Sequence, residues 1–108
     1  MSDILHRLMT VVADRKQNPP SRSYTSTLFA GGVERIGAKV LEEAAEVVDA
    51  AKESGEAGRQ HLVNEAADLI YHLLVMLAHR EATLEQVESV LAQRFGISGL
   101  DEKESRGQ

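Results

Sequence analysis

The sequence predicts an all-α protein, a helical bundle of about four main helices. Three observations lead to this prediction. Apolar side chains recur at spacings of three and four residues in four separate segments. No segment shows a convincing strand pattern or an internal repeat. Aromatic residues make up only 4% of the chain and Trp is absent, so aliphatic side chains and alanine must fill the core.

The first two helices are expected over residues 3–16 and 33–53. The Pro19-Pro20 pair ends the first helix, because the residue before a proline avoids the helical region. Residues 21–32 are rich in hydroxyl groups and are expected to form a loop, with a single helical turn at 25–29. The two glycines that close this stretch favour a break before the second helix.

Two more helices are expected over residues 60–80 and 83–95. Ser54-Gly55 separates the second helix from the third, since glycine is favoured just beyond a helix C-terminus. Thr83 is followed three residues later by Gln86, which is the spacing of a capping box. Connections this short are typical of a helical bundle.

Length and composition limit the class of protein. The 108 residues fit a single domain, 1–108, with a core over about 3–95 and a polar tail over 96–108. The net charge of −5 disfavours a nucleic-acid partner, because proteins that bind nucleic acids usually carry a basic surface. Cysteine is absent, which excludes disulfides and thiol chemistry. The longest apolar region, 66–78, is too short to span a membrane, so a cytoplasmic protein is expected.

The third predicted helix carries a polar stripe where burial is expected. Its apolar residues cover almost the whole circumference, which is typical of a buried helix. At about 100° per residue, a strip roughly 60° wide holds Glu65, Asp68, His72 and His79. Neighbouring carboxylates at such a position repel each other, so a cation must compensate them.

The second predicted helix offers a matching set of acids. On the helical wheel Glu42 faces water, whereas Glu43 borders the apolar stripe and Glu46 lies just outside it. Antiparallel packing would bring two carboxylate pairs together, and carboxylate-only sites favour Mg²⁺ or Mn²⁺. The expected metal-ligating and catalytic residues are Glu43, Glu46, Glu65 and Asp68. Such a site suits hydrolysis of a phosphoanhydride, and no P-loop pattern is present.

Simpler interpretations remain open for these residues. An acidic cluster is usually a solvated surface, and this holds most strongly for Glu42. A salt bridge from Lys39 to Glu43 would also account for part of the cluster. His72 is expected to be a hydrogen-bonded core histidine rather than a ligand, and no role is evident for His6 or His61.

Three stretches of the chain show a family resemblance. Residues 23–29 (SYTSTLF), 39–48 (KVLEEAAEVV) and 64–75 (NEAADLIYHLLV) resemble segments of the all-α MazG-like nucleoside-triphosphate pyrophosphohydrolases. More narrowly, they are similar to the phosphoribosyl-ATP pyrophosphohydrolase family of histidine biosynthesis. The resemblance covers residues 3–95, with Leu41 standing where many members have glycine.

The resemblance implies a reaction, a metal and an assembly. The reaction is hydrolysis of phosphoribosyl-ATP to phosphoribosyl-AMP and pyrophosphate, with Mg²⁺ as the metal and the four carboxylates as its ligands. A homodimer is also expected because the third helix needs more cover than three other helices supply. An anionic substrate requires local cations and hydrogen-bond donors, and the expected substrate-binding residues are Lys39, Ser23, Thr25, Arg22, Lys103 and Arg106.

Two other functions stay open at this point. A hydrolase that removes ordinary or damaged nucleoside triphosphates would use the same acidic spacing. A non-catalytic helical module could instead bind a basic partner through its acidic groove. Pyrophosphate release from a panel of nucleotides separates these functions.

Overall fold

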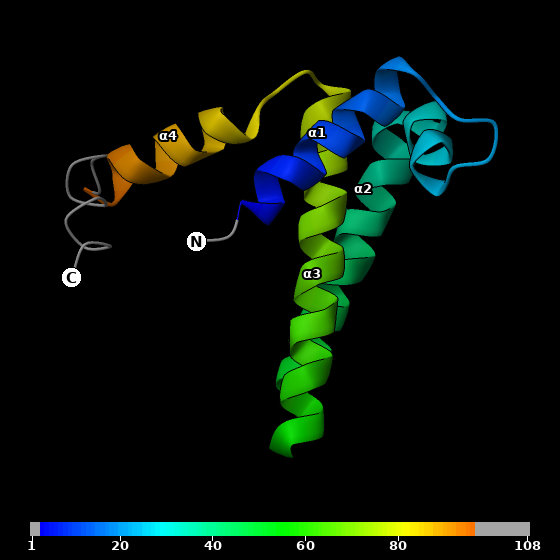
Figure 1. Ribbon diagram of the computed structural model, residues 1–108. Helices are drawn as coiled ribbons and strands as arrows, with labels where there is room; N and C mark the ends of the chain where they lie inside the picture. Colours follow the sequence, from blue (N-terminus) through cyan, green and yellow to red (C-terminus); the bar gives the residue numbers. More distant parts are fainter. Residues whose placement is uncertain (1–2, 97–108) are drawn as a thin grey trace.

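The computed structural model describes residues 3–96, and this range forms four α-helices and no strand. The helices are α1 (Ile4–Gln17), α2 (Tyr24–Ala51), α3 (Gly55–His79) and α4 (Leu84–Arg94). α2 and α3 form a long antiparallel pair, and α1 crosses this pair near one end (Figure 1). The all-α prediction is confirmed. Residues 97–108 of the predicted tail, including Lys103 and Arg106, lie outside the described residues.

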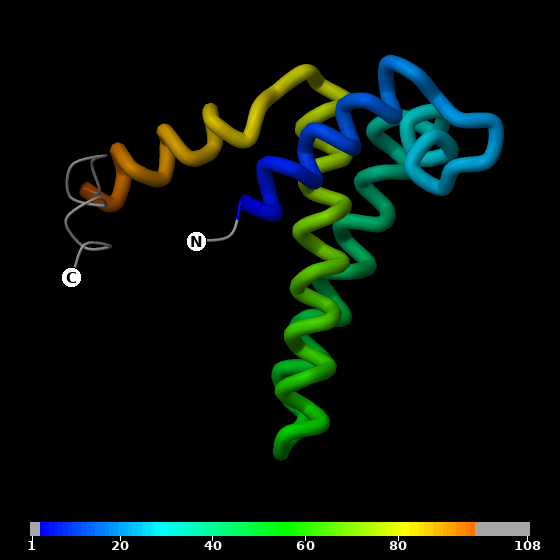
Figure 2. The backbone as a smooth tube through the Cα atoms, in the orientation of Figure 1, coloured from blue at the N-terminus to red at the C-terminus, as the bar shows by residue number. Residues whose placement is uncertain are grey.

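The start of α2 differs from the prediction of a loop up to residue 32. The helix begins at Tyr24, where Ser23 is the N-cap and its Oγ accepts a hydrogen bond from the Ser26 amide at 3.3 Å. Gly32 alone departs from helical geometry, with φ 70° and ψ −162°, so two helical segments, 24–31 and 33–51, meet at a sharp kink where the glycine pair predicted a break (Figure 2). Burial of the Leu28 side chain holds the short segment before the kink in place.

The start of α3 also differs, since this helix begins five residues before the predicted Gln60. Gly55 has a φ of 77°, a conformation that favours glycine, and it opens the helix directly after the turn. At Gly58 an added Cβ would lie 2.5 Å from the carbonyl oxygen of Glu53. The glycines therefore permit a tight turn that returns α3 along α2.

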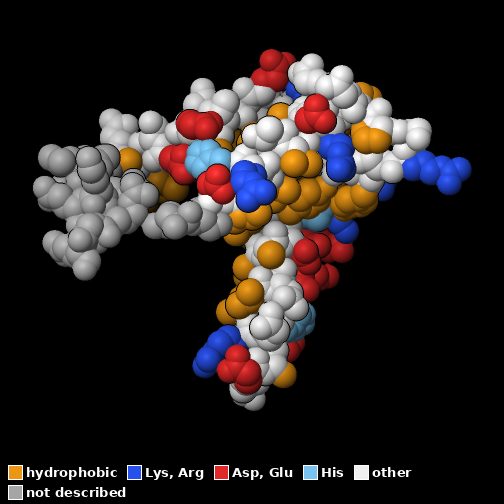
Figure 3. Space-filling view, in the orientation of Figure 1, with side chains coloured by type: hydrophobic (Ala, Val, Ile, Leu, Met, Phe, Trp, Pro, Cys, Tyr) orange, Lys and Arg blue, Asp and Glu red, His pale blue; other side chains and the backbone are white. Residues whose placement is uncertain are grey.

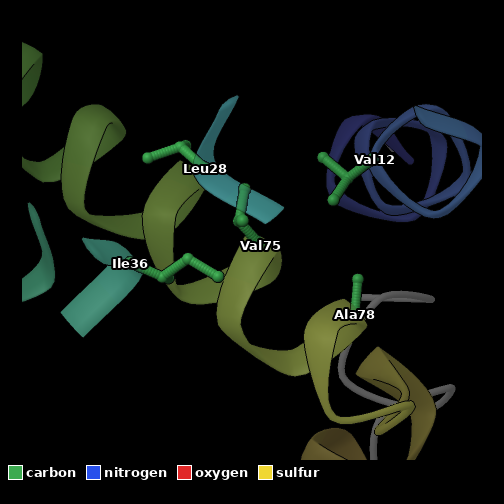
Figure 4. Close-up of a cluster of buried hydrophobic side chains, with 5 residues drawn as sticks. All are labelled: Val12, Leu28, Ile36, Val75 and Ala78. Atoms are coloured by element: carbon green, nitrogen blue, oxygen red, sulfur yellow. The ribbon is translucent and has the colours of Figure 1, made fainter. Parts of the chain in front are cut away.

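The core lies where α1 crosses the α2–α3 pair. Its buried side chains are Val12, Leu28, Ile36, Val75 and Ala78 (Figure 4). Lys16 adds a polar contact beside this core, since its Nζ donates to the carbonyl oxygens of Ala78 and His79, each at 3.0 Å. The Ala78 carbonyl also accepts from the Glu81 amide at 3.1 Å, so Lys16 adds a second donor there and its charge complements the helix dipole.

One side of α3 has no cover from the other described residues. Val63, Ile70 and Leu73 are 55%, 38% and 44% exposed, which agrees with the expectation that the other helices supply too little cover for this helix. α2 likewise exposes Leu41 and Val48. Burial of this apolar surface needs a contact beyond those that residues 3–96 make with one another.

The fourth helix, α4, does not pack along the other three helices as it would in a compact bundle. Its capping box is confirmed, because Thr83 Oγ1 accepts from the Gln86 amide and Gln86 Oε1 accepts from the Thr83 amide. α4 nevertheless projects away from the α2–α3 pair (Figure 1). Of its apolar side chains only Leu84 is buried, whereas Val90 and Leu91 are 42% and 49% exposed. Three helices thus form the packed body and α4 extends from it. Within residues 3–96 no helix has both the length and the apolar character to cross a membrane.

His6 links α1 to α4. Its Nδ1 lies 3.1 Å from Glu85 Oε2 and its Nε2 lies 3.0 Å from Glu88 Oε2, which corrects the view that His6 has no evident role. The hydrogen bond with Glu88 is the main cause of a raised pKa of His6. The protonated ring donates to both carboxylates and holds the two helices together.

The His6 contact predicts a pH dependence of α4. Because the folded pKa of His6 is raised, its stabilising contribution is complete below the unfolded pKa of about 6.5 and is lost as pH rises through the folded value. Hydrogen-exchange protection factors of the α4 amides are therefore expected to fall as the pH rises above about 6.5 and the His6 ring loses its proton. His6→Gln should remove this change. A fall of the same size in the variant would contradict the role of His6.

Candidate active site

Three carboxylates meet between the two long helices. Glu43 and Glu46 lie on α2 and Glu65 lies on α3, and each offers an oxygen within 4.8 Å of the oxygens of the other two. Acidic side chains gather on one side of the α2–α3 pair in Figure 3. The i,i+3 spacing of the two α2 residues places them on one helix face, next to the polar stripe of α3.

Burial makes this cluster unusual for acidic residues. Glu43 is only 7% exposed. The Oε2 atoms of Glu43 and Glu65 are buried and have no hydrogen-bond partner among the described residues. An unpaired buried carboxylate oxygen is costly, so these two atoms fit a bound cation that would coordinate them. Their all-oxygen chemistry suits a hard ion such as Mg²⁺.

The charges of the clustered carboxylates also affect one another, as expected for a site that needs a compensating cation. The pKa of Glu46 is raised, chiefly by a hydrogen bond with the Glu65 carboxyl and then by the charge of Glu65. His61 Nε2 lies 3.4 Å from Glu65 Oε1, while its Nδ1 lies 3.0 Å from Glu53 Oε2. The hydrogen bond with Glu53 is the main cause of a raised pKa of His61. His61 thus supplies some of the compensating positive charge at one end of the cluster. The sequence analysis assigned no role to His61, but its i,i+4 spacing to Glu65 could have predicted this ion pair.

Asp68 lies apart from the three grouped carboxylates. It is one turn after Glu65 on α3 and is exposed. Its carboxylate forms no ion pair or hydrogen bond with the residues that the structure describes, and only its backbone carbonyl is engaged, by His72. The structure therefore brings three members of the predicted quartet together and leaves the fourth at the edge of the site.

Lys39 pairs with Glu42 rather than with Glu43. Its Nζ lies 3.3 Å from Glu42 Oε1, and Glu42 is exposed as predicted. The pKa of Lys39 is raised first by the hydrogen bond that it donates to Glu42 and next by the charge of Tyr24, with the charge of Glu43 contributing as well. Lys39 thus lies one turn before Glu43 on α2 and is paired with Glu42.

The other predicted substrate-binding residues lie at the start of α2. Ser23 caps the helix and also accepts from Arg15 Nη1 at 3.4 Å. Thr25 is buried, and its hydroxyl already has a partner in the hydroxyl of Tyr71. Arg22 is exposed and lines a surface hollow of about 550 Å³ together with Ser23 and Tyr24.

His72 is a buried, hydrogen-bonded histidine, as predicted. It is 5% exposed, and its two ring nitrogens contact the Tyr24 hydroxyl and the Asp68 carbonyl, each at 2.9 Å. The sequence did not predict the contact of Tyr24 with His72. Residues 21–32 were expected to be mainly a loop, and helical spacing therefore gave no indication that Tyr24 packs against α3.

The fold and the cluster define an all-helical protein whose two facing helices present carboxylates of the kind that hold a divalent cation. Comparison with known proteins identifies the family. The family model for phosphoribosyl-ATP pyrophosphohydrolase matches residues 5–95, and the chain belongs to this family.

Several curated relatives are similar over nearly the whole chain. A protein of Rhodopirellula baltica is 52% identical over 102 residues, which is 94% of this chain and 85% of that one. A protein of Dechloromonas aromatica is 46% identical over 105 residues, covering 97% and 94% of the two chains. One of Paracoccus denitrificans is 48% identical over 102 residues, covering 94% and 92%. All three are named phosphoribosyl-ATP pyrophosphatase.

Proposed function

We propose that the chain hydrolyses the α–β phosphoanhydride of phosphoribosyl-ATP, giving phosphoribosyl-AMP and pyrophosphate, the second step of histidine biosynthesis. The observation that supports this most directly is the carboxylate cluster between α2 and α3 in a chain whose relatives carry the name of that activity. The family to which the chain belongs is named for the same reaction.

The proposal assigns the metal site to Glu43, Glu46, Glu65 and Asp68, with Mg²⁺ as the ion and Mn²⁺ as a substitute. The two unpaired buried oxygens of Glu43 and Glu65 support the assignment. The Asp68 carboxylate is exposed at the outer edge and has no partner within residues 3–96, so it is available as a further ligand. When bound, the ion neutralises polyphosphate charge and lowers the pKa of a water molecule.

Positively charged side chains of the protein, Lys39 and Arg22, are assigned to binding of the anionic substrate. Because the net charge is −5, an anionic nucleotide needs local positive charge to approach. Lys39 next to the cluster is placed to contact the phosphates. Arg22 and Ser23, at the hollow near the start of α2, are placed to contact a more distant part of the same substrate.

The function is tested with a substrate panel assayed for pyrophosphate release with and without Mg²⁺. Phosphoribosyl-ATP is expected to be the preferred substrate, and release is expected to depend on the ion. Equal turnover of ordinary nucleoside triphosphates would support the alternative hydrolase. If no nucleotide in the panel releases pyrophosphate, the result would instead support a non-catalytic helical module that binds a basic partner.

We also propose that the protein is a homodimer built on the uncovered side of α2 and α3. The apolar residues on this side are Leu41 and Val48 of α2 and Val63, Ile70 and Leu73 of α3. Two copies of a helix pair can bury such stripes as a four-helix bundle.

The dimer proposal predicts that Ile70→Asp yields a monomer. Ile70 is 38% exposed in the single chain, so the charge does not disturb the core but would be buried in the interface. Light scattering at micromolar concentration measures the mass. Val11→Asp on α1, which is 46% exposed, is the matched control and should remain dimeric. A monomeric parent protein would overturn the proposal.

A further inference from the structure

The partly buried contact between Tyr24 and His72 joins the start of α2 to α3, the helix that carries Glu65. Tyr24 Oη and His72 Nε2 are 2.9 Å apart, and His72 Nδ1 is 2.9 Å from the carbonyl oxygen of Asp68. A carbonyl oxygen only accepts, so Nδ1 carries the hydrogen. In the neutral ring Nε2 is then an acceptor, and the Tyr24 hydroxyl donates to it. The contact therefore has one direction and holds the Tyr24 ring by its hydroxyl end.

The Tyr24 ring is fixed but not covered. Tyr71 lies nearly parallel to it, with ring centroids 6.4 Å apart at 23°, and the His72 ring meets it edge-on at 6.0 Å. Despite these contacts Tyr24 is 47% exposed. The chain contains two Tyr, two Phe and no Trp. Among these four aromatic residues, the other exposed one is Phe95, which follows α4.

The position of the ring relates it to the carboxylate cluster by two routes. Along α2, Lys39 lies one turn before Glu43, and its Nζ donates to Glu42 Oε1 at 3.3 Å. The hydrogen bond that Lys39 donates to Glu42 is the main cause of its raised pKa, and the charges of Tyr24 and Glu43 add to it. Through His72, Tyr24 is linked to α3 seven residues after Glu65, which is about 10 Å along the helix axis. His72, which holds the ring, and Glu65 of the cluster thus lie about two turns apart on the same helix.

We infer that Tyr24 is the specificity-determining residue that stacks against the purine base of the nucleotide, and that His72 is the positioning residue that holds Tyr24 in place. The inference rests on the proposed function, since it places the phosphates of the same nucleotide at the carboxylate cluster. An exposed aromatic ring of fixed orientation is a suitable platform for a base, because the ring need not be ordered when the base binds. Arg22 and Ser23, which line the hollow beside Tyr24, then face the sugar-phosphate attached to that base.

The test compares the binding of AMP with that of ribose 5-phosphate, which lacks the base. Dissociation constants measured by calorimetry in the presence of Mg²⁺ should favour AMP by about tenfold or more in the parent protein, the range expected for one stacked base. Tyr24→Leu should remove this preference by weakening AMP alone, whereas Tyr24→Trp should restore it. A purely structural role of Tyr24 would weaken both ligands equally.

Steady-state kinetics give a second readout. Tyr24→Leu should raise KM for phosphoribosyl-ATP about tenfold or more while kcat stays within about threefold. Tyr24→Phe keeps the ring but loses the bond to His72, and a rise of about threefold in KM is expected. Phe95→Leu, the matched control at the other exposed aromatic residue, should leave KM unchanged.

The outcomes separate this inference from the proposed function. Equal binding of AMP and ribose 5-phosphate by the parent protein, or an unchanged AMP preference in Tyr24→Leu, overturns the role of Tyr24. Calorimetry does not depend on turnover. A failure of the parent protein to release pyrophosphate therefore counts against the proposed function and not against the base platform.

Discussion

Glu43→Gln is expected to lower kcat on the order of 100-fold or more, because it removes a charge that holds the catalytic ion and its bound water. Glu43 is buried, and its Oε2 has no partner among the described residues, so the amide would keep the shape of the side chain and lose only its charge. Pyrophosphate release at saturating substrate and several Mg²⁺ concentrations measures the effect.

Glu42→Gln is the matched control on the preceding residue of the same helix. Its carboxylate is 53% exposed and pairs with Lys39, so its loss is expected to change kcat by less than about threefold. Equal losses in the two variants would show that the acidic face acts only through its general charge. The pair of variants thus separates a metal site from a solvated acidic surface.

The same substitution has an expected effect on stability. In the absence of metal, Glu43→Gln removes one negative charge from a partly buried cluster in which neighbouring carboxylates repel. The melting temperature of the metal-free variant should therefore equal or exceed that of the parent protein. Mg²⁺ should raise the melting temperature of the parent protein more than that of the variant.

Asp68→Asn is likewise expected to reduce kcat on the order of 100-fold, although Asp68 lies outside the three grouped carboxylates. Its carboxylate has no partner among residues 3–96, and the residue stands one turn beyond Glu65 at the edge of the site. The asparagine removes the charge without disturbing the backbone carbonyl that His72 contacts. Folding should survive, which circular dichroism would verify.

Asp49→Asn is the control for this second prediction. Asp49 is also an exposed aspartate, but it pairs with Lys52 near the end of α2, and its replacement should leave kcat unchanged. Parent-like activity in Asp68→Asn would mean that the site consists of three carboxylates and that the assignment of the fourth ligand is wrong.

Local patterns in the sequence predicted the parts of the molecule that depend on neighbours along one helix. The limits of α1 and α4, the capping box at Thr83 and the exposure of Glu42 all follow from helical spacing. The same spacing placed Glu43 and Glu46 on a face toward α3, where the structure finds them with Glu65.

Features that depend on distant contacts were not predictable in this way. The hydroxyl-rich segment 24–31 has a composition typical of a loop, and it is helical because Leu28 is buried in the core and because Thr25 and Tyr24 bond to α3. The projecting position of α4 likewise has no signal in its own periodicity, which merely indicates an apolar face. His6 gained a partner only through the approach of α1 to α4.

The kink at Gly32 divides α2 into two cooperative units. Helical structure that forms in residues 33–51 cannot propagate through a residue at φ 70° and ψ −162°, so the segment before it depends on its own contacts with α3. The α2–α3 hairpin that carries the carboxylates is a local unit and can persist while this segment opens. Local unfolding would then expose the Tyr24 end first, and nucleotide binding would protect its amides against exchange far more than those around Glu43 and Glu65.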